Sequence, residues 1–169
     1  MISLHDAPIV ELSELDSNNL IKLKNDNSIV LVGGCFDLLH LGHVAFLKNA
    51  KNKGDLLIVA IESDRFIEES KKRTPFHNQD QRAKVLSSMR YVDLVVKLPY
   101  FENAKRDEAY AGLVDVIKPN TIAVTENDKA YEKKKNHADR VGAKIEVVTK
   151  NLESLSSSAI LKYGNLLSD

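Results

Sequence analysis

Short runs of aliphatic and β-branched residues recur along the chain and predict the strands of a sheet. Apolar residues occupy odd and even positions of these runs alike, which is typical of parallel strands covered on both faces. Helices must then cover those faces, so the pattern indicates an α/β architecture. The predicted strands are SIVLV (28–32), DLLIVAIES (55–63), VDLVVKL (92–98), TIAVT (121–125) and AKIEVV (143–148).

The segments between these runs have the spacing of helices. In HVAFLKNAKNK (43–53), apolar residues recur every three positions and form one stripe. Asn78, followed by Gln81 three residues later, is typical of a capping box at a helix start. The other predicted helices are NQDQRAKVLSSM (78–89), KRDEAYAGLVDVIK (105–118), DKAYEKKKNHADRV (128–141) and an N-terminal helix over residues 11–24.

Strands that alternate with helices predict right-handed βαβ units. We therefore expect an α/β fold with a single Rossmann-like domain, in which a five-stranded parallel sheet has helices on both faces. This domain takes in residues 1–169. Within it we expect an N-terminal helical extension (1–27), the sheet core (28–150) and a C-terminal motif with its helix (151–169).

The composition narrows the class of protein. Lys and Arg number 24 and Asp and Glu also number 24, so the formal net charge is zero. This balance disfavours nucleic acid or an anionic membrane as the partner. The one cysteine allows no intramolecular disulfide, which indicates a reducing, cytoplasmic location. We expect neither a signal peptide nor a membrane span, because the apolar run LLIVAI (56–61) is too short to cross a bilayer.

The stretch GGCFDLLHLGH (33–43) joins the first predicted strand to the first predicted helix. Ligands of open parallel sheets bind beyond the carboxyl ends of the strands, where this stretch lies. Its glycines permit close approach of the backbone to a ligand, and the free N–H groups of the helix start attract phosphate. His40 and His43 share a face of that helix start and can donate hydrogen bonds to an anion. The stretch therefore predicts a phosphate site.

Other interpretations of the histidine pair stay open at this point. Zinc needs three or four ligands, whereas the remaining histidines, at 5, 77 and 137, are scattered, so we expect no protein-bound metal. The pair could also be ordinary histidines of a helix start. The chain contains neither G-x-x-x-x-G-K-[ST] nor G-x-G-x-x-G, which disfavours a P-loop protein and a dinucleotide oxidoreductase.

The pattern G-x-F-D-x-x-H-x-G-H, here Gly34 to His43, resembles the signature of the cytidylyltransferase-like nucleotidyltransferases. The glycerol-3-phosphate cytidylyltransferases and the heptose-phosphate adenylyltransferases are similar in style. The similarity continues through FLKNAKNKGDLLIVAIESD (46–64) and QRAKVLSSMRYVDLVV (81–96) and ends near LSSSAI (155–160). It therefore takes in nearly everything after residue 28.

The resemblance implies roles for particular residues. His40, His43 and Arg82 would be catalytic, with the histidines stabilising charge that grows at the α-phosphate. Asp37 would orient the site, and a basic loop that includes Lys71, Lys72 or Arg73 would close on the substrates. Lys133 to Lys135 are interpreted as a solvated helix face. The implied nucleotide-binding residues are Gly33, Gly34, Cys35, Phe36, Asp37, Gly42, Lys71, Lys72, Thr125, Glu126, Asn127, Asp128, Ser156, Ser157 and Ser158.

The same resemblance implies transfer of CMP or AMP from CTP or ATP to a phosphorylated small molecule, with release of pyrophosphate. CTP is slightly favoured, Mg²⁺ is expected on the nucleotide, and a homodimer is expected by analogy. The acceptor could be a polyol phosphate, a sugar phosphate, or a vitamin-derived phosphate such as flavin mononucleotide or phosphopantetheine. The arginine that commonly precedes the C-terminal motif is missing here. A nucleotide-binding sensor of the same fold therefore stays open as an alternative. A third interpretation is a fragment related to class I aminoacyl-tRNA synthetases, which share an H-x-G-H site.

Overall fold

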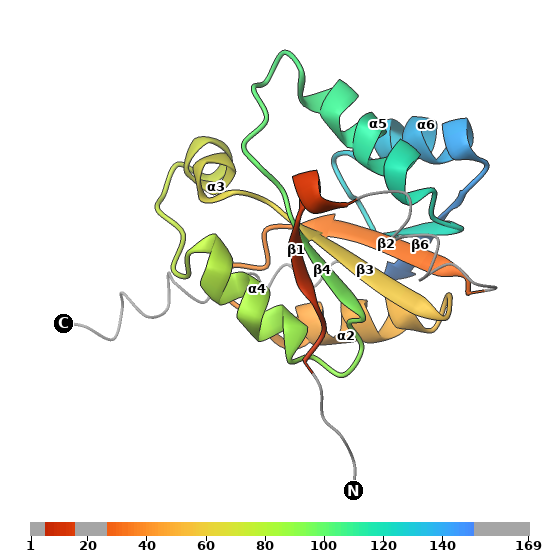
Figure 1. Ribbon diagram of the computed structural model, residues 1–169, viewed down its shortest axis with the longest axis horizontal. Coiled ribbons are helices and arrows are strands. Elements are labelled where there is room, and N and C mark those ends of the chain that lie inside the picture. Colours follow the sequence, from red (N-terminus) through yellow and green to blue (C-terminus); the bar gives the residue numbers. More distant parts are fainter. Residues whose placement is uncertain (1–5, 16–26, 151–169) are drawn as a thin grey trace, which may run out of the picture.

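Six parallel strands form the centre of the fold in a computed structural model, which describes residues 6–15 and 27–150 (Figure 1). Their spatial order is β1-β4-β3-β2-β5-β6, and every neighbouring pair is parallel. The strands are β1 (Ile9–Glu11), β2 (Ile29–Gly34), β3 (Leu56–Ile61), β4 (Leu94–Lys97), β5 (Thr121–Thr125) and β6 (Lys144–Thr149). The order reverses at β2, which has β3 on one side and β5 on the other.

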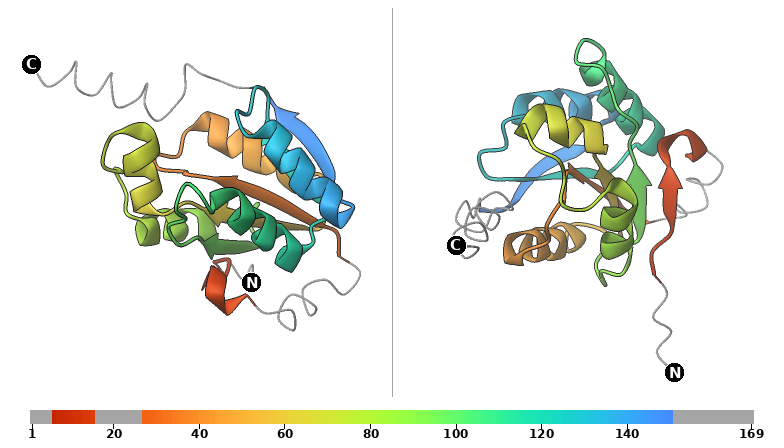
Figure 2. Two further views of the ribbon diagram at one scale, coloured as in Figure 1. Left: turned by 90° about the horizontal axis from the view of Figure 1, so that it is seen from above. Right: turned by 90° about the vertical axis from the view of Figure 1, so that its left-hand side faces the viewer.

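Helices cover both faces of this sheet. Helices α2 and α4 lie on one face and α5 and α6 on the other, as the edge-on view in Figure 2 shows. The short helix α3 follows the carboxyl end of β3. The bounds are η1 (Leu12–Glu14, a 3-10 turn), α2 (Leu41–Lys51), α3 (Asp64–Lys71), α4 (Gln79–Ser87), α5 (Arg106–Ile117) and α6 (Tyr131–Val141).

Alternate residues of β2 belong to two separate cores. Ile29 and Leu31 pack with residues of α5 and α6, whereas Val30 and Val32 pack with residues of α2 and α4. All four side chains are buried. Burying each apolar side chain of this size contributes roughly 1.5–3 kcal/mol to folding. Two buried faces explain why the strands read as continuous apolar runs in the sequence.

The α/β class and the parallel sheet with helices on both faces are confirmed, but the prediction of five strands is wrong by one. The sixth strand, β1, lies inside the segment that was expected to be a helical extension. It pairs with β4, Ile9 opposite Val95 and Val10 opposite Val96. Three residues are too few to show a period, so this pairing is decided by contact with β4. The helix predicted over 11–24 gives way to β1 and η1 up to residue 14, and residues 16–26 lie outside the described residues.

Helix α3 does not appear among the helices predicted above. It begins where the Ser63 hydroxyl accepts a hydrogen bond from the Phe66 N–H at 3.2 Å. It spans only eight residues and ends at Lys72, whose φ of 55° lies in the left-handed region. The segment is short and highly charged, and its only apolar residues are Phe66 and Ile67, which gives a sequence pattern little to work from. The basic residues that were predicted to lie in a loop therefore begin on a helix, with Lys71 as its last residue.

Candidate active site

A cavity of about 250 Å³ opens at the carboxyl ends of β2, β5 and β6, where the strand order reverses. Such a reversal is where open parallel sheets bind their ligands. We call it the histidine cavity. Its lining consists of Gly33, Gly34, Cys35, Phe36, His40, Gly42, His43, Phe46, Lys71, Thr125, Asp128, Lys134, Thr149 and Lys150.

Two stacked imidazoles form part of its wall. The ring centroids of His40 and His43 are 3.9 Å apart, with 28° between the ring planes. His40 is the N-cap of α2, and His43 lies in the first turn of that helix. Within the described part of the chain, the Nδ1 atoms of both rings are buried and have no hydrogen-bond partner. The helix start therefore presents an imidazole pair with unused hydrogen-bonding capacity.

Burial lowers the pKa of both histidines. The pKa of His43 falls to about 4, because burial disfavours the imidazolium and the neighbouring His40 adds repulsion. Burial likewise lowers the pKa of His40. Both rings are therefore neutral at pH 7 in the free protein. An anion bound beside them would favour their charged forms and raise both pKa values.

The loop before the histidines has a strained backbone. Phe36 has a φ of 47°, in the left-handed region that bulky residues rarely occupy, and its side chain is buried. The ring packs close to Gly34, where an added Cβ would lie 3.0 Å from the Phe36 ring. A side chain at position 34 would therefore force the Phe36 ring to shift by a few tenths of an ångström. Strain of this kind persists where surrounding contacts enforce it, often at functional sites.

A lysine and its partner line the far side of the histidine cavity. The Lys134 Nζ lies 2.8 Å from the Asp128 carboxylate, which also accepts a hydrogen bond from the Ala130 N–H. The Lys134 side chain is 27% exposed, whereas those of Lys133 and Lys135 are 68% and 46% exposed. The interpretation of this lysine run as a solvated helix face is therefore wrong for Lys134.

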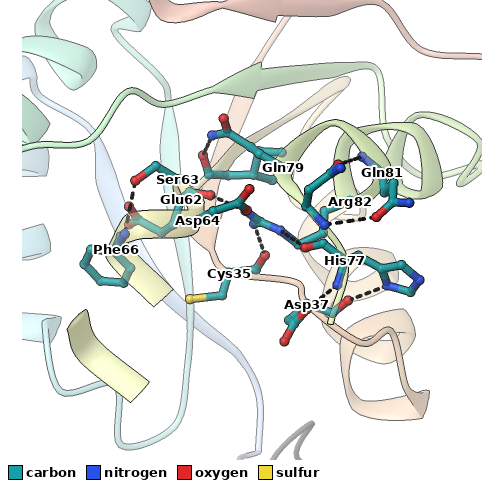
Figure 3. A network of polar contacts seen from close by, with 12 residues as sticks. Cys35, Asp37, Glu62, Ser63, Asp64, Phe66, His77, Gln79, Gln81 and Arg82 are labelled. Carbon is teal, nitrogen blue, oxygen red and sulfur yellow. Dashed lines mark hydrogen bonds and ion pairs between the residues drawn. The ribbon is translucent and has the colours of Figure 1, made fainter. Parts of the chain in front are cut away.

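Arg82 supports the histidine-containing loop from behind (Figure 3). Its guanidinium is fully buried and donates to the carbonyl oxygens of Cys35 at 2.6 Å, Glu62 at 2.7 Å and His77 at 3.1 Å. It also pairs with the Asp64 carboxylate at 2.7 Å. These bonds tie the end of β2, the end of β3 and the starts of α3 and α4 together. The structure thus places Arg82 behind the loop and not among the residues that line the histidine cavity, and its catalytic role stays a prediction.

Asp37 fixes the segment between α3 and α4. Its buried carboxylate accepts hydrogen bonds from the Arg73 guanidinium at 2.6 Å and from the Phe76 and His77 N–H groups at 2.8 and 3.1 Å. Burial alone would raise the pKa of Asp37, but the bonds from His77 and Arg73 outweigh it and lower the pKa. The carboxylate therefore stays charged and holds this segment against the loop.

A second cavity, of about 410 Å³, lies between the sheet and helices α5 and α6. We call it the apolar cavity. It shares Gly33, Gly34, Cys35 and Lys134 with the histidine cavity, so the two adjoin. Its other lining residues are Leu31, Val32, Ala60, Glu62, Phe66, Leu98, Arg106, Asp107, Tyr110, Leu113, Val114, Ile122, Ala130, Lys133 and His137.

Most of the predicted site residues meet at the histidine cavity. Asp37, Lys72, Arg82, Glu126 and Asn127 are described but do not line it. Ser156, Ser157 and Ser158 lie outside the described residues. The residues brought together there are Gly33, Gly34, Cys35, Phe36, His40, Gly42, His43, Lys71, Thr125 and Asp128.

Sequence reasoning missed several lining residues. Phe46 and Thr149 were not expected, and Lys150 was not among the predicted site residues. Lys134 lies in the first turn of α6, a helix that starts beside the cavity. That position, early in a helix that follows a central strand, is the one signal that could have indicated it. Nothing in the sequence pattern indicated the polar residues of the apolar cavity, which include Glu62.

Two further properties concern residues 6–15 and 27–150 only. No three His, Cys, Asp or Glu side chains gather there as a set of metal ligands. In that same part of the chain, no helix has the length and apolar character that a bilayer crossing requires.

Comparisons with known proteins agree with this geometry. Residues 31–162 match the family model described as cytidylyltransferase-like. The chain is 39% identical over 120 residues to the FAD synthase of Pyrococcus horikoshii, which covers 70% of this chain and 77% of that protein. It is 38% identical over 101 residues to the bifunctional protein HldE of Koribacter versatilis, covering 56% of this chain but only 21% of that protein.

Solved structures share the fold. The pantoate-beta-alanine ligase of Francisella tularensis superimposes with a TM-score of 0.65 at 18% identity, over 98% of this chain and 80% of that one. The lipopolysaccharide core biosynthesis protein of Thermoplasma volcanium does so with a TM-score of 0.55 at 24% identity, over 73% and 95% of the two chains. At these identities the likeness concerns the fold alone.

Proposed function

Because the chain belongs to the cytidylyltransferase-like family and is a nucleotidyltransferase, we propose that it transfers AMP from ATP to flavin mononucleotide (FMN). The products are FAD and pyrophosphate. The observation that carries the proposal is the 39% identity with an FAD synthase over most of that protein's length. FAD contains AMP and FMN joined through a pyrophosphate, so ATP takes the place of CTP as the favoured nucleotide.

The reaction is an in-line displacement at the α-phosphorus of ATP. An oxygen of the FMN phosphate forms a new bond to that phosphorus, and the bond from it to the oxygen of the β-phosphate breaks. Pyrophosphate leaves with the electron pair of the broken bond. Little covalent chemistry falls to the protein, so positioning and electrostatic stabilisation provide the rate.

The histidine cavity suits the triphosphate. The start of the eleven-residue helix α2 directs free N–H groups and the positive end of its dipole toward the cavity. His40 and His43 add hydrogen-bond donors, and Lys71 adds a positive charge. Charge that develops on the phosphate oxygens during transfer would favour the imidazolium forms of rings that are neutral in the free protein.

Lys134 is suited to the point of transfer because it lines both cavities. An ammonium group there faces the nucleotide on one side and the acceptor phosphate on the other. The ion pair with Asp128 fixes its position. We assign Lys134 the task of reducing the repulsion between the two anionic phosphates as they approach.

Mg²⁺ fits this site as an ion carried by the nucleotide. The described residues offer no set of three protein ligands, whereas Mg²⁺ commonly binds through substrate phosphates and retains several waters. The ion would supply further neutralisation of the triphosphate charge.

The test is release of pyrophosphate and formation of FAD from ATP and FMN with Mg²⁺, alongside CTP in place of ATP. We expect turnover with ATP and FMN, and its loss in a His40→Ala/His43→Ala double variant that still unfolds cooperatively. Binding of ATP without turnover on any phosphorylated acceptor would favour the sensor instead. Turnover with CTP alone would overturn the choice of nucleotide.

A further inference from the structure

The apolar cavity changes character along its depth. At the carboxyl ends of the strands its lining is polar, with Glu62 directly after β3 and Arg106 at the start of α5. Deeper in, the lining is aliphatic. Leu31 on β2 lies beside Ile122, its partner on the adjacent strand β5, and Leu113 comes from the middle of α5. Leu31 precedes Gly34 by three residues, which along a strand is roughly 10 Å.

The polar mouth contains a buried acid. Among the described residues, the Glu62 carboxylate has one hydrogen-bond partner, the Tyr110 hydroxyl. A carboxylate can accept about four hydrogen bonds, so acceptor capacity remains toward the cavity. Burial raises the pKa of Glu62, although Tyr110 and the positive charges of Arg106 and Lys134 oppose that effect. A buried polar group with capacity to spare gains from a ligand that supplies donors.

The acid lies close to the point where the cavities join. The Glu62 N–H donates to the Gly34 carbonyl at 3.1 Å, and Gly34 lines both cavities. A ligand whose phosphate lies at this junction would therefore pass Glu62 within its first few atoms. Only the part beyond those atoms would reach the aliphatic floor.

We propose that the apolar cavity binds the acceptor with its ring on the aliphatic floor, while the Glu62–Tyr110 pair accepts hydrogen bonds from hydroxyls next to its phosphate. The inference rests on the proposed function and deepens it by naming the cavity and the residues that recognise the acceptor. They suit a phosphate ester with a hydroxylated linker and a large ring with an apolar edge, as in FMN. A polyol or sugar phosphate would leave the floor unfilled, and ligand cavities of roughly 300–1,000 Å³ are built to bury most of their ligand.

The test measures steady-state constants for FMN and ATP in isosteric variants. Glu62→Gln is expected to raise the KM for FMN about tenfold, with kcat within about threefold and the KM for ATP unchanged. Tyr110→Phe is expected to raise the same KM by a smaller factor. Leu113→Phe fills the floor and should raise the KM for FMN, whereas Val116→Phe, on the same helix but 40% exposed, should not.

A change of ligand tests whether Glu62 recognises the linker of the acceptor or has only a structural role. The matched ligand is an FMN analogue whose linker has no hydroxyls. Wild type should use it about tenfold less well than FMN, whereas this difference should be clearly smaller in Glu62→Gln, because the amide oxygen accepts hydrogen bonds from the linker more weakly than the carboxylate does. Equal discrimination in both proteins would overturn the role of Glu62.

The outcomes distinguish this inference from the proposed function. If wild type turns over FMN and neither Glu62→Gln nor Leu113→Phe changes the KM for FMN, the inference is overturned but the proposed function is not. Turnover with glycerol 3-phosphate or a sugar phosphate, but not FMN, overturns both the acceptor class and FMN as substrate. If nothing turns over, FMN fluorescence decides the inference: binding to wild type and about tenfold weaker binding to Glu62→Gln supports it, and no binding overturns it.

Discussion

Lys134 is the side chain whose proposed role is least visible in the sequence. Its neighbours Lys133 and Lys135 have the same chemistry but far more exposure. We expect Lys134→Met to lower kcat for FAD formation about 100-fold, in the range seen when one transition-state donor is removed, with little change in the KM for ATP. Initial rates at saturating substrates measure this effect.

Lys135→Met is the matched control for that variant. Lys135 pairs with Asp139 on the surface of the same helix and lines neither cavity. Its kcat should stay within about twofold of wild type. Equal losses in the two variants would mean that general positive charge, and not the position of Lys134, supports the reaction.

The lowered pKa of His43 predicts how the stability of the folded protein depends on pH. Its pKa is about 4 in the folded protein and 6.5 in the unfolded chain, so below pH 6.5 the unfolded chain takes up the proton first. Stability is therefore lost as pH falls from 6.5 toward 4, by about 2 kcal/mol at pH 5. Urea denaturation at pH 7 and pH 5 should show a correspondingly smaller loss in His43→Asn. An equal loss in both proteins would contradict the lowered pKa.

Arg82 holds several secondary-structure elements together, because its hydrogen bonds join two strand ends to two helix starts. Arg82→Met leaves three carbonyl oxygens and the Asp64 carboxylate without their donor. We expect a loss of about 3–5 kcal/mol in the free energy of unfolding, together with weaker ATP binding. Urea denaturation and titration with ATP measure the two effects.

Arg90 provides the comparison for that variant. It is exposed, and its guanidinium lies over the Tyr91 ring, 5.7 Å from the ring centroid. Arg90→Met should change stability by less than about 0.5 kcal/mol. If Arg82→Met were equally mild, the loop would be held by other contacts.

Elements with a long pattern could be predicted, and short ones could not. The strands β2 to β6, and the capping box at Asn78 and Gln81, were predicted correctly because their signals are local. The strand β1 and the helix α3 were missed. Segments of three and eight residues contain too few apolar side chains to be identified from sequence. Strand β1 depends on its pairing with β4, and helix α3 begins at the Ser63 cap.

The fold places the histidine cavity and the apolar cavity next to each other, and this arrangement predicts how tightly the product binds. If the proposed function holds, FAD would occupy both cavities at once, whereas AMP and FMN would each occupy one. Linking the two halves makes the second contact intramolecular, so FAD should bind at least about tenfold more tightly than either half. Calorimetric titration with FAD, FMN and AMP measures this, and equal affinity for FAD and FMN would argue against simultaneous occupation.

The sequence by itself determined the class of fold, the family and the histidine loop. Each depends on residues that are close along the chain, as Gly34, His40 and His43 are. Tertiary structure alone decided the role of Arg82, the position of Lys134 and the buried pair of Glu62 and Tyr110. Their partners are distant in sequence, as Tyr110 is 48 residues from Glu62. A linear pattern indicates which face of an element is buried, but only packing decides which polar group lies opposite it.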